Sequence, residues 1–240
     1  MNIVVLMAGN SEEFFKEGLK YPKYLFEVNG TPLVERVVKN LSSVASKFIF
    51  LINKEDAQRW HMDNVIKLLC PTAEVMVVEG STKGAACSAL YAIDSINNDE
   101  ELLITNGDQI LDINLKEFVT AIRSYDGGTV IFDSVHPRWS YVSLDSNGYI
   151  VQAEEKRPIS RNATAGVYYF KKGKDFVSGA SAMIKKDAHV NGNYYVCPVF
   201  NELILEQKKL GTFKIDRNQY HSLATVEGAR AYDTYAKAEK

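Results

Sequence analysis

The sequence lacks the features of several protein classes. Its 240 residues include 28 basic and 30 acidic side chains, a formal net charge of −2, so no cationic surplus exists to drive binding to nucleic acid or anionic lipid. No run approaches the ~18 consecutive apolar residues of a membrane span, and the first residues do not form a signal peptide. We therefore expect a cytoplasmic protein with neither a nucleic-acid nor a membrane partner.

Cysteine is also scarce. Cys70, Cys87 and Cys197 are an odd number at wide spacing, with no Cys-x-x-Cys pair. This pattern is typical of reduced thiols, most often small buried apolar side chains. The remaining composition is that of an ordinary globular protein, with 46% hydrophobic and 24% charged residues. It excludes a disordered tail, a collagen-like fibre and a disulfide scaffold.

The first half of the sequence alternates apolar runs with helical spacings. Continuous β-branched runs predict buried strands at 3–6, 48–52, 75–78, 102–104 and 130–132. Apolar residues at i, i+3, i+4 and i+7 predict helices around 34–41, 86–93 and 115–122. This alternation predicts an α/β fold with a mostly parallel, Rossmann-like sheet and helices on both faces. Ligands bind such sheets at the carboxyl ends of the strands.

The second half has a different pattern, typical of a small antiparallel annex. Alternating residues with an Asn147-Gly148 turn predict strands at 139–144 and 149–154, and another strand is expected at 165–170. Further along the chain, a separate short strand fits 211–216. Helical patterns cover 174–186, 199–208 and 226–237. Because no repeat or Pro/Gly-rich linker interrupts the chain, we expect a single domain over 1–240 with halves at 1–135 and 136–240.

Several predicted strand ends carry candidate ligand-binding residues. Gly9 lets the backbone approach phosphate oxygens, and Asp108 places a carboxylate where a Mg²⁺ with bound phosphates could lie. The small residues of 79–86 suit a flat nucleobase. The Glu155-Lys156 pair could hold a hydroxyl and a phosphate. Each feature also has a structural interpretation, respectively a tight turn, a helix cap, close helix packing and a surface ion pair.

In this order, the segments resemble the nucleotide-sugar pyrophosphorylases, the sugar-phosphate nucleotidylyltransferases. The resemblance rests on Leu6-Met7-Ala8-Gly9 with Pro22-Lys23, 79–89, Gly107-Asp108, Glu155-Lys156 with Pro158, Gly166-Val167-Tyr168 and 224–227. The stretch 193–201 is similar to a bacterial branch associated with capsule and surface-polysaccharide synthesis. The resemblance implies a GT-A-like nucleotidyltransferase fold with a nucleotide-binding and a sugar-phosphate-binding half.

The resemblance also implies a reaction and a site. A nucleoside triphosphate and a small phosphorylated substrate would react with Mg²⁺ present, releasing pyrophosphate, with Lys23, Asp108 and Lys156 as catalytic residues and Asp108 as metal ligand. Glu79, an acceptor-only carboxylate, suits an amino group such as that of cytosine or guanine and can also accept from an imide N–H; of these, CTP is slightly favoured. The implied nucleotide contacts are Leu6, Ala8, Gly9, Asn10, Lys23, Glu79, Gly84, Ala85 and Asp108; the implied substrate contacts are Gly107, Glu155, Lys156, Gly166 and Tyr195. The oligomeric state is open, and a homo-oligomer is one outcome.

Two departures from the family pattern stand out. The first loop of the family typically reads Gly-x-Gly-x-Arg, whereas Gly9 is followed here by an acidic stretch through Glu13. Carboxylates there would repel a triphosphate unless a metal or a lysine, such as Lys16 or Lys20, intervenes. The second metal-binding Asp of many members is replaced by Ser222, which leaves Asp108 with Asp216 as a candidate helper. His221, beside Ser222, has a packing and a functional interpretation.

These departures keep two other functions open. One is a pseudo-enzyme that binds the nucleotide or the sugar but has lost catalysis. The other is a GT-A-type glycosyltransferase, a class that often carries Asp-x-Asp where 106–108 here offers one carboxylate.

Overall fold

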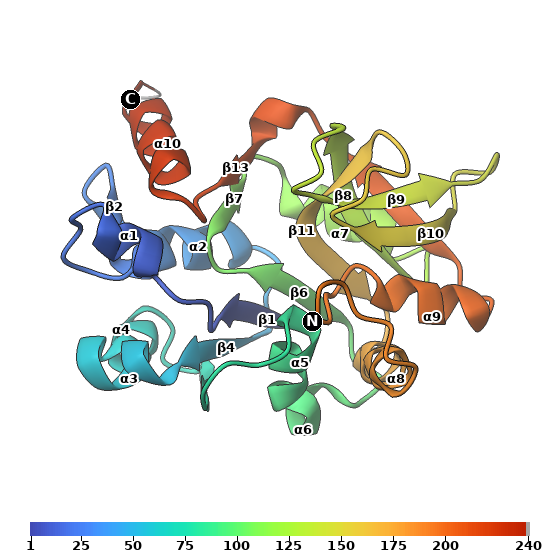
Figure 1. The fold of residues 1–240 in the computed structure, drawn as a ribbon, viewed down its shortest axis with the longest axis horizontal. Coiled ribbons are helices and arrows are strands. Elements are labelled where there is room, and N and C mark those ends of the chain that lie inside the picture. The colour runs from blue at the N-terminus through green and yellow to red at the C-terminus, as the bar shows by residue number, and fades with distance from the viewer. Residues whose placement is uncertain (239–240) are drawn as a thin grey trace.

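A nine-stranded sheet runs through the molecule and takes strands from both halves of the chain (Figure 1). The computed structural model describes residues 1–238. The strand order is β10-β9-β11-β6-β1-β4-β5, with β8 paired to β11 and β12 paired to β8. The strands of this sheet are β1 Asn2–Met7, β4 Lys47–Asn53, β5 Glu74–Val78, β6 Leu102–Asn106, β8 Gly127–Asp133, β9 Ser140–Leu144, β10 Ile150–Glu155, β11 Asn162–Phe170 and β12 Leu210–Lys214.

The four strands β5, β4, β1 and β6 are parallel, as predicted. Their continuous apolar runs are explained by cover on both faces. Residues of α2 and α7 pack with Ile3 and Val5 on one face, and residues of α5 and α8 pack with Val4 and Leu51 on the other. Figure 1 shows α2 above these strands, and α5 and α6 below them. The α/β fold with helices on both faces is therefore confirmed.

The helices follow the predicted periodicities, with three unpredicted additions, one after β1 and two after β4. The α-helices are α1 Glu12–Lys16, α2 Leu33–Leu41, α3 Lys54–Trp60, α4 Met62–Leu69, α5 Ala85–Ala89, α6 Ile93–Ile96, α7 Leu115–Ile122, α8 Gly173–Lys185, α9 Val199–Leu205 and α10 Val226–Ala238, and the 3-10 turns are η1 Lys23–Leu25, η2 Leu90–Ala92 and η3 Arg217–Gln219. Helices α1, α3 and α4 were not predicted, and the predicted 86–93 helix is divided by η2. No helix within residues 1–238 is both long and apolar enough to cross a membrane.

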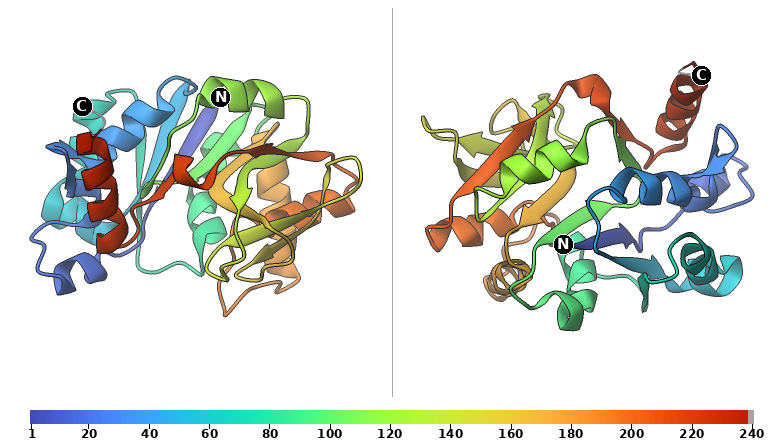
Figure 2. Two further views of the ribbon diagram at one scale, coloured as in Figure 1. Left: turned by 90° about the horizontal axis from the view of Figure 1, so that it is seen from above. Right: turned by 180° about the vertical axis from the view of Figure 1, so that it is seen from behind.

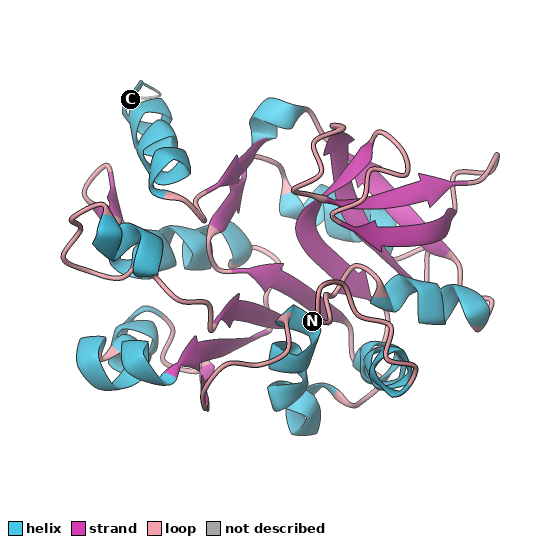
Figure 3. Ribbon diagram, in the orientation of Figure 1, coloured by secondary structure: helices cyan, strands magenta, loops and turns pink. Residues whose placement is uncertain are grey.

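The second half forms the predicted antiparallel annex (Figure 3). Strands β9 and β10 make a hairpin closed at Gly148, and β11 pairs with β6, β8 and β9, antiparallel to each. Strand β11 lies between β6 and β8, so the predicted 130–132 strand is not a neighbour of the parallel group. One sheet thus spans both predicted halves, and its annex lies against the carboxyl end of β6.

A two-stranded ribbon returns the end of the chain to this edge. Strand β13 (Tyr220–Ser222) pairs with β7 (Gln109–Leu111), which directly follows β6. Beyond it, α10 lies beside the small hairpin of β2 (Glu27–Val28) and β3 (Thr31–Pro32), where the Asn29 amide donates to Asp233 at 2.7 Å. Both views of Figure 2 show this C-terminal helix against the N-terminal segments. The ribbon therefore brings residues 220–224 next to Asp108.

Candidate active site

Two adjoining cavities lie at the carboxyl ends of the parallel strands. The larger cavity has a volume of about 570 Å³ and the smaller cavity about 270 Å³. Leu6, Ala85, Asn106 and Asp108 line both cavities. The strand-end rule for parallel sheets therefore holds here, and Asp108 marks the junction.

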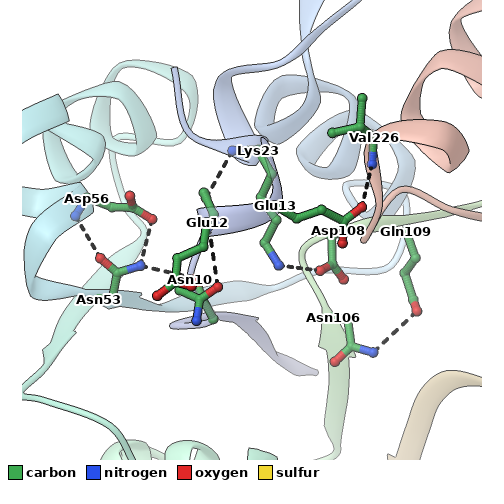
Figure 4. A network of polar contacts seen from close by, with 12 residues as sticks. Asn10, Glu12, Glu13, Lys23, Asn53, Asp56, Asn106, Asp108, Gln109 and Val226 are labelled. Carbon is green, nitrogen blue, oxygen red and sulfur yellow. Dashed lines mark hydrogen bonds and ion pairs between the residues drawn. The ribbon is translucent and has the colours of Figure 1, made fainter. Parts of the chain in front are cut away.

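A buried ion pair occupies this junction (Figure 4). The Lys23 ammonium lies 2.6 Å from Asp108 Oδ2, and Lys23 is only 7% exposed. Burial disfavours the charged lysine, but Tyr24 and Asp108 outweigh burial and hold the pKa of Lys23 above its ordinary value. The two side chains predicted to bind triphosphate and metal thus pair with each other in this structure.

Gly107 does not line either cavity, although the sequence placed it in the substrate site. Its amide donates to Leu6 O at 2.9 Å, and a Cβ there would lie 2.4 Å from Met7 Cγ. Only glycine permits this approach of β6 to β1, which positions the following Asp108.

The loop after β1 is held by a polar network at the end of β4. Asn53 Nδ2 donates to Gly9 O at 3.1 Å and to Asp56 Oδ2 at 2.8 Å, while its Oδ1 accepts from the Asp56 amide at 2.7 Å and caps α3 (Figure 4). Burial raises the pKa of Asp56 to about 6. Asn53 and Asp56 line the larger cavity with Ala8, Gly9 and Asn10. Neither Asn53 nor Asp56 was predicted as a site residue. Asn53 ends β4, so the rule that ligands bind at the carboxyl ends of parallel strands would have found it.

The acidic residues of this loop lie outside both cavities. Glu12 pairs with Lys16 at 3.5 Å on the surface. Glu13 Oε1 accepts from the Val226 amide at 3.3 Å, at the N-terminus of α10, where negative charge is favourable (Figure 4). Lys16 and Lys20, the predicted compensating lysines, do not line the cavities either. In this structure the acidic loop therefore contacts the N-terminus of α10 through Glu13.

The loop after β5 forms another wall of the larger cavity. Gly84 and Ala85 line it, as predicted, together with Gly80, Ser81 and Thr82. Glu79 does not: its side chain is exposed and pairs with Lys54 at 3.0 Å. The side chain predicted to select the base thus lies outside the cavity, and mainly small side chains and backbone form this wall.

Gly84 also joins this wall to the 190–197 segment. Its φ is +102°, and a Cβ there would lie 2.4 Å from Tyr194 O. The Tyr194 amide donates to Lys83 O at 2.7 Å, and Tyr194 O accepts from the Ala86 amide at 3.0 Å. Because the next residue, Tyr195, lines the smaller cavity, the two cavities share a wall that is fixed by backbone hydrogen bonds.

The smaller cavity is built largely by the annex. Glu155, at the end of β10, is buried and accepts from Ser140 Oγ, and burial raises the pKa of Glu155. Gly166 lies in a bulge of β11 at φ +65°, where a Cβ would lie 2.6 Å from Gln109 Oε1. Side chains that the sequence analysis did not single out complete the wall, among them Gln109, Arg138, Trp139, Ser140, Thr164 and Tyr168.

Lys156 lies beside the smaller cavity without lining it. It adopts a left-handed φ of +57°, and its ammonium donates to the Tyr195 hydroxyl at 3.0 Å. This hydrogen bond raises the pKa of Lys156. Tyr195, which lines the cavity, therefore connects Lys156 to it.

The C-terminal ribbon supplies the last part of the site. Ser222 lines the smaller cavity, and the Leu223 amide donates to Asp108 O at 2.8 Å. Asp216 caps η3 and lines neither cavity, so it does not act as the expected helper of Asp108. His221 bonds Asp112 at 2.7 Å and packs on the rings of Tyr232 and Tyr235, which supports its packing interpretation.

The donor set at the junction fits a weakly held Mg²⁺. Within residues 1–238, no group of three or more His, Cys, Asp or Glu side chains could hold a metal. Mg²⁺ is commonly bound through one or two carboxylates and substrate phosphates while it keeps several waters. Asp108 would provide such a partial site, and Ser222 lines the same smaller cavity.

Comparison with known proteins identifies the family of this chain. The family model described as nucleotidyl transferase matches residues 3–195. The chain belongs to the nucleotidyl transferase family. This membership confirms the family-level prediction and the nucleotidyltransferase class.

Individual members of this family show how far the similarity extends. The chain is 25% identical over 176 residues to the bifunctional protein GlmU of Methanocaldococcus jannaschii, covering 72% of this chain and 40% of that protein. It thus spans less than half the length of that relative. Its fold is similar to a nucleoside-diphosphate-sugar pyrophosphorylase from Vibrio cholerae, with a TM-score of 0.82, 21% identity and coverage of 97% and 99%. An inositol-1-phosphate CTP transferase from T. maritima gives a TM-score of 0.74 at 14% identity, with coverage of 100% and 96%.

Proposed function

We propose that this nucleotidyl transferase makes a nucleoside-diphosphate sugar, or a related activated metabolite, and pyrophosphate from a nucleoside triphosphate and a small phosphorylated substrate. The observation that carries the proposal is the junction at Asp108, which lines both cavities. A volume of about 570 Å³ suits a nucleotide, and about 270 Å³ suits a smaller molecule.

The proposed reaction depends mainly on positioning of the two substrates and on neutralisation of the charge on their phosphates. A phosphate oxygen of the substrate in the smaller cavity attacks the α-phosphorus of the nucleotide in the larger cavity, and pyrophosphate leaves. Lys23 supplies a buried positive charge for the triphosphate, and release from Asp108 frees its ammonium to donate. Lys156, held by Tyr195, supplies positive charge to the phosphorylated substrate.

Mg²⁺ is part of this proposal, with Asp108 as its protein ligand. When bound, it would neutralise charge on the phosphates. Asp108 would hold this ion through the same carboxylate that pairs with Lys23 in the structure.

The finer assignments rest on the sequence. The preference for CTP rested on Glu79, whose side chain lies outside the larger cavity and pairs with Lys54, so CTP is tested on equal terms with the other nucleoside triphosphates. A cytoplasmic location and a role in surface-polysaccharide synthesis are parts of the proposal that follow from the composition and the resemblance. The oligomeric state stays open, with a homo-oligomer as one outcome.

One observation favours a second candidate function, a protein that binds the same ligands without turnover. Ser222 stands beside Asp108 where many family members carry a second carboxylate. A neutral hydroxyl is a weaker ligand for Mg²⁺, so Asp108 would be the one carboxylate available to hold the ion.

The test is pyrophosphate release with Mg²⁺, using CTP, UTP, GTP, dTTP and ATP against sugar phosphates and phosphorylated non-sugars. We expect one pair to release pyrophosphate. A nucleotide that raises the melting temperature without release of pyrophosphate would support the binding protein instead. Release of a nucleoside diphosphate from an activated sugar would support a glycosyltransferase.

A further inference from the structure

Arg138 is an exposed cationic residue in the wall of the smaller cavity. It lies in the connection between β8 and β9, and its guanidinium carbon is 4.3 Å from the centroid of the Trp139 ring. Trp139 itself lines the cavity and packs edge-on against Phe132 and Tyr220, at centroid distances of 5.5 Å each. A guanidinium stacked on a fixed indole is held in place before a ligand arrives.

Arg138 has no carboxylate partner within residues 1–238. Four other arginines do: Arg59, Arg123, Arg157 and Arg161 each pair with a Glu or Asp side chain. The two carboxylates that line the smaller cavity are already engaged, Asp108 by Lys23 and Glu155 by Ser140. Five guanidinium N–H donors at the cavity are thus free for a ligand.

A second guanidinium increases the positive charge at this place. Arg217 lies 5.7 Å from the Trp139 centroid and donates to Tyr220 O at 2.7 Å, and it too lacks a carboxylate partner within the described chain. Burial lowers the pKa of Arg217, and the positive charge of Arg138 lowers it further. An anion beside Trp139 would relieve the repulsion between these cations.

We propose that Arg138 binds an anionic group of the phosphorylated substrate and thereby determines which substrates enter the smaller cavity. Guanidinium groups match the paired oxygens of phosphate and carboxylate, so the anion is either the phosphate that attacks or a second acidic group on the same molecule. The inference rests on the proposed function for the identity of the smaller cavity. It adds a specificity residue beside the Glu155-Lys156 strand end, where the Lys156 amide donates to Trp139 O at 3.0 Å.

The test is calorimetric binding of inorganic phosphate, glucose 1-phosphate and glucuronic acid 1-phosphate to the full chain. The variants are Arg138→Gln, which removes the positive charge, and Arg138→Lys, which keeps the charge but lacks the planar guanidinium group. Arg230→Gln is the matched control, because Arg230 is exposed on α10 and lines neither cavity. Melting temperatures show that each variant is folded.

We expect Arg138→Gln to raise Kd about tenfold, Arg138→Lys to lie in between, and Arg230→Gln to match wild type. A loss for all three ligands identifies the phosphate as the bound group, and a loss confined to glucuronic acid 1-phosphate identifies a second acidic group. Equal affinities of wild type and Arg138→Gln for every ligand, or no binding to wild type, would overturn the inference. Binding that depends on Arg138 without pyrophosphate release in any nucleotide assay would instead overturn the proposed function alone.

Discussion

The larger and the smaller cavity are built in different ways. The larger cavity follows the ends of parallel strands, and much of its wall is backbone and small side chains, such as Gly9, Gly80 and Gly84. The smaller cavity takes its wall from the annex and the C-terminal ribbon, with large side chains such as Arg138 and Tyr195. Under the proposed function, we infer from this difference that the larger cavity is a general nucleotide site and that the smaller cavity selects the second substrate. Four predictions test this division, from the largest expected effect to the smallest.

Asp108→Asn should affect both cavities at once. Loss of the carboxylate removes the proposed metal ligand, and we expect kcat for pyrophosphate release to fall at least about a hundredfold. The buried Lys23 also loses its ionic partner, so the melting temperature should drop. Asp94→Asn, exposed on α6 and outside both cavities, is the control. A folded Asp108→Asn enzyme with wild-type kcat would remove Asp108 from the proposed mechanism.

Gly84→Ala should break the link between the cavities. The added Cβ would lie 2.4 Å from Tyr194 O, and the backbone is at φ +102°, so the 190–197 segment must move. We expect a loss of roughly 2–3 kcal/mol in unfolding free energy and higher KM values for both substrates. Gly148→Ala is matched, because its φ is +82° and no atom lies within 4 Å of the new Cβ. If both variants behave alike, backbone strain alone explains the effect and the shared wall has no role.

Asp56→Asn, a change in the wall of the larger cavity alone, should alter the stability of the protein in a pH-dependent way. The pKa of Asp56 is raised to about 6 in the folded protein, above the ordinary value of about 3.9. The folded state therefore binds the proton more tightly, so wild-type stability from this group falls as pH rises from about 4 to about 6. Urea unfolding should show Asp56→Asn more stable than wild type by about 2 kcal/mol at pH 7, with the gain vanishing near pH 4. A difference independent of pH would contradict this account.

Tyr195→Phe should change the smaller cavity alone. The variant keeps the ring but loses the hydroxyl that holds Lys156 at 3.0 Å. We expect KM for the phosphorylated substrate to rise about three- to tenfold, with the nucleotide KM unchanged. Tyr91→Phe, at an exposed tyrosine outside both cavities, serves as the control. An equal rise in the nucleotide KM would show that the cavities do not divide the two substrates.

The sequence predicted the larger cavity better than the smaller one. Gly9 and Asp108 follow strands whose apolar runs are local and continuous, so their placement needs no knowledge of distant contacts. Glu79 also follows a strand, yet its side chain turns to Lys54 on the surface, because a strand end fixes the position of a backbone and not the direction of a side chain. Arg138 gave no signal in the sequence, since an arginine in a loop is usually solvated.

The sequence by itself determined most of the strands and helices, the two kinds of sheet and the family, but not α1, α3, α4 or the short strands β2, β3, β7 and β13. Burial and periodicity are encoded in neighbouring residues, and these local patterns decide such features. Only the tertiary structure decided that Lys23 pairs with Asp108, that Glu13 braces α10, and that Tyr194 joins the two cavities. The partners in the first two contacts are 85 and 213 positions apart in the sequence, and those in the third about a hundred. At such separations the path of the chain through the sheet decides which side chains meet.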